Sequence, residues 1–311
     1  MRWAALPPGR RARWLIPRRP AAARAGLAVY QPMTPWGRAG WESARLIARV
    51  GAFYLVPTQG ASELTRAVQP YIASGGSVAV SFAHGGRRGV ALVLDAMDRP
   101  THAVKVALDE DGRQRLAREA DRLDRLGRLL QPPLAAPRVI ESGDGVLALE
   151  PVAWLPRSRP WFLPEQLARG IGRFHAAVEG EGGVAARAGH GDFAPWNVMA
   201  TRQGWTLLDW EEARLASAPY DDPFHYLVQA HALLGRPRAA QILEGLQRRG
   251  WVGRAIGAYA AAARLPGVEP RDALVDYLRR SMPADDSTRP DHVRGRMARR
   301  ALLSRLEQNR R

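Results

Sequence analysis

The sequence contains no cysteine, which excludes disulfide bonds, thiolate metal sites and cysteine nucleophiles. No uninterrupted apolar run approaches the roughly 18 residues that a membrane-spanning helix requires. The arginine-rich N-terminus also lacks the continuous apolar core of a signal peptide. We therefore expect a cytoplasmic protein.

Lysine is almost absent, because Lys105 is the only one among 46 basic residues. A preference for arginine over lysine reflects the nucleotide composition of the source genome, but it does not explain an excess of base over acid. The chain has 30 acidic residues and a formal net charge of +16. Such an excess favours an anionic partner: a nucleotide, a phosphorylated polymer, nucleic acid or an anionic membrane surface.

Acidic residues are missing from the first 41 positions, which carry eight arginines. Four prolines interrupt the beginning of this segment, and we interpret residues 1 to about 26 as a basic, poorly ordered arm. Thr34-Pro35 then resembles a helix start, and we expect a helix as far as about Tyr54. Its stripe could lie on a membrane interface, but we favour packing on its own domain; the stripe consists of Trp36, Gly40, Ile47, Val50 and Tyr54.

The segments 77–82, 90–94 and 101–107 have the composition of three strands in a meander. Gly85 and Gly86 in the first turn would let the backbone approach a phosphate, although two glycines in a hairpin more commonly form only a turn. Lys105 lies among apolar residues of the third strand, where a buried ammonium is costly unless it is paired. Glu119 is at the edge of the apolar stripe of a helix expected over 111–130. It could reach Lys105, or both could be surface charges.

The chemistry of the sequence is concentrated in His-Gly-Asp-Phe-Ala-Pro-Trp-Asn, residues 190–197, and Leu-Leu-Asp-Trp-Glu, residues 207–211. Two short strands, 198–200 and 205–208, are expected around a turn at 201–204. This hairpin would place Asn197 and Asp209 side by side at its open end, close to Asp192. Carboxylate and amide oxygens suit Mg²⁺, which usually shares its coordination with phosphates. The alternative is a polar loop whose carboxylates are merely solvated.

The spacing His-x-Asp-x-x-x-x-Asn followed by a strand ending in Asp resembles the catalytic loop and metal-binding aspartate of the protein-kinase-like phosphotransferases. It is most similar to the aminoglycoside phosphotransferase and choline kinase branch. The resemblance implies an α+β, two-lobed protein-kinase-like fold, with a small antiparallel sheet lobe and a mostly helical lobe. It also implies ATP and Mg²⁺ as cofactors, Asp192 as catalytic base, and Asn197 and Asp209 as metal ligands.

The same resemblance implies roles for further residues and a division of the chain. Residues 1–69 would be the basic arm and amphipathic helix, 70–152 the nucleotide-binding lobe, and 153–311 the helical catalytic lobe, with ATP between the lobes. Phosphate contact falls on Lys105, which Glu119 would pair, and on Gly85 and Gly86. Glu150 and Val152 fall in the linker that would present backbone groups to adenine, and His190 and Asp222 would support the catalytic turn. Ala194 departs from protein kinases, which have a lysine there.

The predicted function is ATP- and Mg²⁺-dependent phosphoryl transfer to a hydroxyl of a small molecule. Arginines outnumber acids in the C-terminal helices, expected at 230–246, 252–263, 271–280 and 290–307. This favours an anionic sugar or glycoconjugate, including one carried on a lipid, which would place the enzyme at the inner face of the membrane. The alternatives are an aminoglycoside-type antibiotic phosphotransferase and a non-catalytic nucleotide-binding scaffold. Nucleic acid is not favoured, because the basic residues are spread along the chain without a recognisable binding motif.

Overall fold

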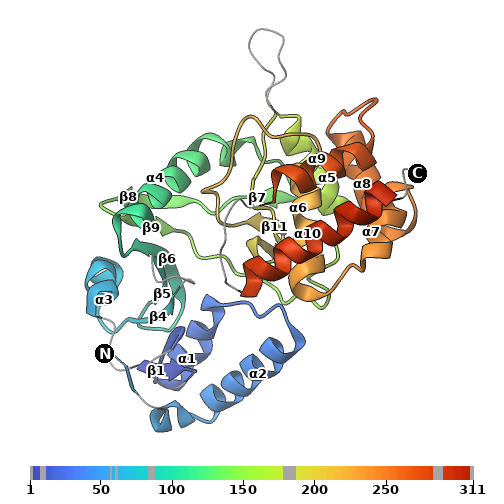
Figure 1. Cartoon of the computed structure of the whole chain (residues 1–311). Coiled ribbons are helices and arrows are strands. Elements are labelled where there is room, and N and C mark those ends of the chain that lie inside the picture. Colours follow the sequence, from blue (N-terminus) through green and yellow to red (C-terminus); the bar gives the residue numbers. More distant parts are fainter. Residues whose placement is uncertain are drawn as a thin grey trace. The chain divides into compact units, whose positions relative to one another are not determined.

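An antiparallel sheet forms the centre of the first part of the chain (Figure 1). The computed structural model describes residues 3–7, 12–56, 58–59, 62–82, 88–177, 187–282 and 290–308. Within these residues the sheet has eight strands in the order β3-β1-β2-β4-β5-β6-β9-β8. Their bounds are β1 Trp3–Leu6, β2 Trp14–Pro17, β3 Thr58–Gln59, β4 Ser77–Phe82, β5 Arg88–Leu94, β6 Pro100–Ala107, β8 Val139–Gly143 and β9 Val146–Leu149.

The chain divides into two compact units. The first contains Met1–Asp124 and Pro137–Ala153, and the second contains Arg125–Ala136 and Trp154–Arg311. The first unit therefore includes the segment that the sequence set apart as an N-terminal arm and helix. Its helices are α1 Pro20–Gly26, α2 Pro35–Arg49, α3 Ser62–Val68 and α4 Glu110–Arg125.

Strands β1, β2, β4 and β5 of this sheet are buried on both faces, and their successive side chains pack into opposite layers. On one face, Val78 and Val80 of β4 pack in a cluster with Leu64 and Val68 of α3. On the other face, Ala79 packs in a cluster with residues of α1 and α2. Both layers depend on the N-terminal strands, since residues of β1 and β2 alternate between the two clusters.

The interpretation of the N-terminal segment as a poorly ordered arm was wrong for the residues that the structure describes. β1 pairs with β2, and β2 pairs with β4 through Trp14 opposite Ser81. Ala4, Leu15 and Ile16 are completely buried. The interpretation rested on net charge and proline content. Such an argument from composition does not detect two apolar strands of only four residues each.

Helix α2 presents a different face to the core from the one expected. The helix ends at Arg49 instead of continuing to Tyr54, because Gly51 adopts a left-handed φ of 72° before a 3₁₀ turn, Ala52–Leu55. The buried face carries Trp41, Ala44 and Ala48. The expectation that the Trp36 stripe packs on its own domain was wrong for Trp36, Val50 and Tyr54, which are 88%, 69% and 65% exposed. It holds for Ile47, which is half-buried against the core.

The second unit is mostly helical, with a small sheet. Its sheet has the order β10-β11-β7, with β7 parallel to β11. The strands are β7 Leu134–Ala135, β10 Val198–Thr201 and β11 Gly204–Leu207. The helices are α5 Glu165–His175, α6 Asp221–Leu234, α7 Ala239–Leu246, α8 Gly250–Ala262, α9 Pro270–Arg280 and α10 Pro290–Gln308.

Two helices replace the single one expected over 230–246. Helix α6 ends at Leu234, where Gly235 caps it with a left-handed φ of 68°, and Pro237 precedes the start of α7. The remaining C-terminal helices lie within two residues of their predicted bounds. None of the helices in the described residues combines the length and apolarity of a membrane span.

The burial of β2 generates a prediction for stability. Ile16→Ala should lower the free energy of unfolding by about 2–5 kcal/mol, because it removes a buried side chain from the core. Trp36→Ala, at an exposed position, should change it by less than about 0.5 kcal/mol. Urea unfolding followed by tryptophan fluorescence and circular dichroism measures both. Equal, negligible effects would mean that β2 does not contribute to the fold.

Candidate active site

The β10–β11 hairpin determines where two of the predicted ligands lie. Thr201 pairs with Gly204 and Val198 with Leu207, so the turn is shorter than expected, with Arg202 and Gln203 between the strands. The amide of Leu208 donates to the carbonyl oxygen of Asn197 at 2.8 Å, which extends the ladder by one pair. Asp209 therefore lies one residue past the pair instead of directly opposite Asn197.

Asp209 itself marks the point where the chain leaves the strand. Its φ of 62° is in the left-handed region, which is uncommon for residues other than glycine. Aspartate tolerates this conformation better than most side chains. The backbone therefore turns out of the ladder at Asp209, at the open end of the hairpin where Asn197 begins the other strand.

Asp192 and Asn197 are in direct contact. The amide nitrogen Nδ2 of Asn197 donates to Oδ2 of Asp192 at 2.8 Å and to its carbonyl oxygen at 3.0 Å. Asn197 is buried, whereas about a third of the Asp192 side chain is exposed. The proposed base is thus held by a buried neighbour and remains accessible to another molecule.

The start of the loop is fixed by Asp222 in the first turn of α6. Its two carboxylate oxygens accept hydrogen bonds from the backbone amides of His190, at 2.8 Å, and Gly191, at 3.0 Å. Asp222 is only 4% exposed, so these amides supply the partners that a buried charge requires. The contact predicted between Asp222 and the loop is present.

Gly191 and His190 show why this short sequence tolerates little change. Gly191 has a φ of 79°, and a Cβ there would lie 2.1 Å from the carbonyl oxygen of Glu212. Burial lowers the pKa of His190 from its usual value despite several nearby carboxylates, so the ring stays neutral. Its Nε2–H donates to the carbonyl oxygen of Leu208 at 2.9 Å, which ties the loop to the end of β11.

Arg157 supports the other end of the loop, and nothing in the sequence pointed to it. Its guanidinium donates to the carbonyl oxygens of Pro195, at 3.2 Å, and Val198, at 3.4 Å. It also lies over the Trp205 ring, 5.2 Å from the centroid, and contacts the Tyr226 hydroxyl. These carbonyls flank Asn197, so Arg157 acts on the backbone of the loop.

His225 is a second residue that sequence reasoning missed. Its Nε2 lies 2.9 Å from Oδ1 of Asp192, on the carboxylate oxygen that Asn197 does not contact. His225 follows Asp222 by three residues on α6, and that spacing was the only available signal. A contact over 33 positions of sequence was not visible from it.

Lys105 and Glu119 form an ion pair in the first unit. Lys105 Nζ lies 2.6 Å from Glu119 Oε1, and their side chains are 13% and 1% exposed. Lys105 points to the opposite side of β6 from Val104 and Val106, which belong to a core cluster. The contact that the sequence suggested is present; its role toward a nucleotide stays a prediction.

The other predicted nucleotide contacts have different outcomes. Gly85 and Gly86 lie outside the described residues. Glu150 is exposed and pairs with Arg138 at 3.2 Å, and Val152 is half-buried. Both precede the boundary of the units between Ala153 and Trp154. Their proposed backbone contacts to adenine stay predictions.

The donor set of the second unit fits a hard divalent cation. Both Nδ2 contacts of Asn197 go to Asp192, which leaves Asn197 Oδ1 as the amide atom for a metal. Asp209 would add a carboxylate. Among the described residues, no cluster of three or more His, Cys, Asp or Glu side chains could hold a metal by itself. Two oxygen ligands completed by phosphates and water are the usual arrangement for Mg²⁺.

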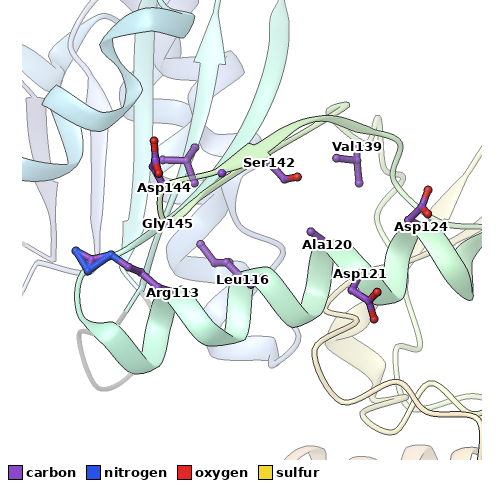
Figure 2. Close-up of a pocket in the computed structure, with 12 residues that line it drawn as sticks. Arg113, Leu116, Ala120, Asp121, Asp124, Val139, Ser142, Asp144 and Gly145 are labelled. Carbon is purple, nitrogen blue, oxygen red and sulfur yellow. The ribbon is translucent and has the colours of Figure 1, made fainter.

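A pocket in the first unit is separate from these residues. It has a volume of about 510 Å³ and lies between α4 and the β8–β9 hairpin (Figure 2). Leu116 and Ala120 of α4 face the hairpin there, with Asp144 and Gly145 at its turn. None of the predicted site residues lines it. This pocket therefore does not mark the predicted chemistry.

Comparisons with known proteins give structural matches only, since no protein-family model and no curated sequence matches the chain. A putative fructosamine-3-kinase from Thermobifida fusca is 19% identical, with a TM-score of 0.51 over 80% of this chain and 98% of the other. Two aminoglycoside phosphotransferases also match, each with a TM-score of 0.48. The one in a ternary complex with streptomycin and ATP is 12% identical over 72% of this chain and 91% of the other. The ADP-bound one is 10% identical over 79% and 99%.

The match to the putative fructosamine-3-kinase concerns the fold, at an identity too low to transfer an activity. The antiparallel strand order β4-β5-β6-β9-β8 in the first unit and the mostly helical second unit agree with this fold. The chain therefore has the two-lobed, protein-kinase-like α+β fold that its motifs predicted.

Proposed function

We propose that the protein is an ATP- and Mg²⁺-dependent phosphotransferase that acts on a hydroxyl group of a small molecule. The observation that carries this proposal is the loop of residues 190–197. There, Asp192 is oriented by Asn197 and remains accessible, while Asp209 lies at the end of the adjoining strand. The matching kinase fold adds support.

In the proposed reaction, the acceptor oxygen bonds to the γ-phosphorus of ATP while the bond to the β,γ-bridging oxygen breaks. ADP leaves with that electron pair, and the proton of the acceptor hydroxyl passes to the Asp192 carboxylate. Asn197 and Asp209 are the proposed ligands of Mg²⁺, which neutralises charge on the phosphates when bound. Lys105, oriented by Glu119, is the proposed phosphate-binding group of the first unit.

The proposed acceptor class is a sugar or glycoconjugate, and an aminoglycoside is the second candidate. Acidic side chains of the second unit are engaged by arginines, as Asp221 is by Arg214 and Arg280, and as Glu165 is by Arg254. This leaves less negative charge to attract a polyamine, and the net charge of +16 favours an anionic acceptor. Parallel assays with phosphorylated sugars and aminoglycosides distinguish the two.

We also propose that the exposed apolar side chains of α2 and the following 3₁₀ turn bind an anionic lipid surface. These side chains are Trp36, Leu46, Val50, Tyr54 and Leu55, each more than half exposed. The same helix carries three arginines and a single acid, Glu42, which is paired with Arg45. Apolar area with adjoining positive charge is the chemistry that an anionic membrane interface attracts.

The first prediction for this function concerns Asp192. Asp192→Asn should abolish both phosphoryl transfer and the slow hydrolysis of ATP by water. The affinity for ATP should stay nearly unchanged, because a base acts in the transition state. Asp209→Asn should instead weaken Mg²⁺–ATP binding. Phosphate release and calorimetric titration with Mg²⁺–ATP separate the effects. Nucleotide binding without turnover in the parent would favour the non-catalytic scaffold, and parental turnover by Asp192→Asn would refute the proposed base.

The second prediction concerns the single lysine. Lys105→Arg should lower kcat/KM roughly 10- to 100-fold, because a planar guanidinium cannot replace the compact ammonium beside Glu119, and a charged hydrogen bond is worth about 1.5–3 kcal/mol. Arg99→Lys, at an exposed ion pair with Asp95, is the matched control and should have no effect. Near-parental activity of Lys105→Arg would remove Lys105 from the site.

The third prediction concerns the membrane. Flotation with phosphatidylserine-containing vesicles should recover the protein, at roughly 1 kcal/mol for each basic residue near the surface, and neutral vesicles should not. Trp36→Ala combined with Val50→Ser should weaken this binding. Met97→Ala, at another exposed apolar residue, should not. Absence of binding, or dimers in place of it, would overturn the lipid proposal.

A further inference from the structure

The carboxylate of Asp192 is held from two sides by different elements of the second unit. Oδ2 accepts from Asn197 at the end of the loop, and Oδ1 lies 2.9 Å from Nε2 of His225 on α6. The final torsion of an aspartate is broad and roughly twofold, so one donor on one oxygen leaves the carboxylate plane free to pivot. A donor on each oxygen fixes that plane.

His225 is itself held by Tyr277 on α9. The Tyr277 hydroxyl lies 3.2 Å from Nδ1 of His225, on the side of the ring away from Asp192. Burial raises the pKa of Tyr277 to about 12, so the phenol keeps its proton and can donate it. An Nδ1 that accepts leaves the ring proton on Nε2, which is the atom that faces the carboxylate.

The environment of His225 agrees with a held ring. The His225 side chain is 16% exposed, and the side-chain amide of Gln229, one turn further along α6, lies 3.4 Å from Nε2. An Nε2–H ring requires this amide to present its oxygen, and not its nitrogen, on that side. Tyr277 is 5% exposed, and Arg299 of α10 and Ser281 contact its phenol. The relay Tyr277–His225–Asp192 therefore connects α9 and α6 to the loop that carries the proposed base.

We propose that His225 is a positioning residue, which donates Nε2–H to Asp192 Oδ1 and so fixes the carboxylate plane for the incoming hydroxyl. This inference rests on the proposed phosphotransferase function, in which Asp192 is the base. Positioning matters because a displacement of about 1 Å at reacting atoms can cost roughly 10²-fold in rate. Tyr277 supports the same geometry by selecting the tautomer.

The test compares variants in Mg²⁺-dependent phosphate release from ATP, with water as the acceptor. His225→Phe keeps a ring but removes both nitrogens, and it should lower kcat about 10- to 100-fold with an unchanged KM for ATP. His225→Gln, whose amide can donate to Oδ1, should recover part of the loss, and Tyr277→Phe should lower kcat less. His231→Phe is the matched control on α6, since His231 contacts the carbonyl oxygen of Pro237.

A second readout does not depend on activity. It is the NMR spectrum of protein that contains ¹⁵N-labelled histidine. The His225 resonances are assigned by their loss in His225→Phe. They should show the Nε2–H tautomer and should shift in Asp192→Asn. Parental kcat in His225→Phe, or an Nδ1–H tautomer unaffected by Asp192→Asn, would overturn the inference. Inactive Asp192→Asn together with fully active His225→Phe would leave the proposed function intact. Active Asp192→Asn would refute that function itself.

Discussion

The structure around the candidate site depends on one buried carboxylate, that of Asp222. It receives two backbone amides from the start of the 190–197 loop, and a buried charge without such partners would be strongly destabilising. Because Asp222 is in the first turn of α6, the position of the helix fixes the position of the loop. Gly191 is the residue that permits the approach, since any side chain there would clash with the backbone at Glu212.

The rest of the loop is fixed by contacts that reach it from other directions. His190 connects the beginning of the loop to the end of β11. Arg157 donates hydrogen bonds to carbonyl oxygens on either side of Asn197. The result is a rigid frame in which Asp192 is a partly exposed acid between a buried amide and an imidazole. Preorganisation of this kind suits a phosphoryl transfer, where positioning and charge supply most of the rate.

In the first unit, burial of apolar side chains determines the arrangement of the strands and helices. Apolar clusters cover both faces of β1, β2, β4 and β5, so even the four-residue strands β1 and β2 contribute to two clusters. Lys105 stands among apolar neighbours of β6 because Glu119 lies within 2.6 Å of its ammonium. Helix α2 then covers one face with Trp41, Ala44 and Ala48 and leaves Trp36 to the surface.

The sequence by itself determined the elements whose signals are local. The strands β4, β5 and β6, the helix that carries Glu119, and the residues Asp192, Asn197 and Asp209 in their order are written in spacing and turn chemistry. It misjudged the N-terminal strands and the buried face of α2, because short apolar stretches and a stripe do not say which surface is available to bury them. Only the tertiary structure brought His225, Tyr277 and Arg157 to the loop, since these contacts join residues distant in sequence through the packing of whole helices.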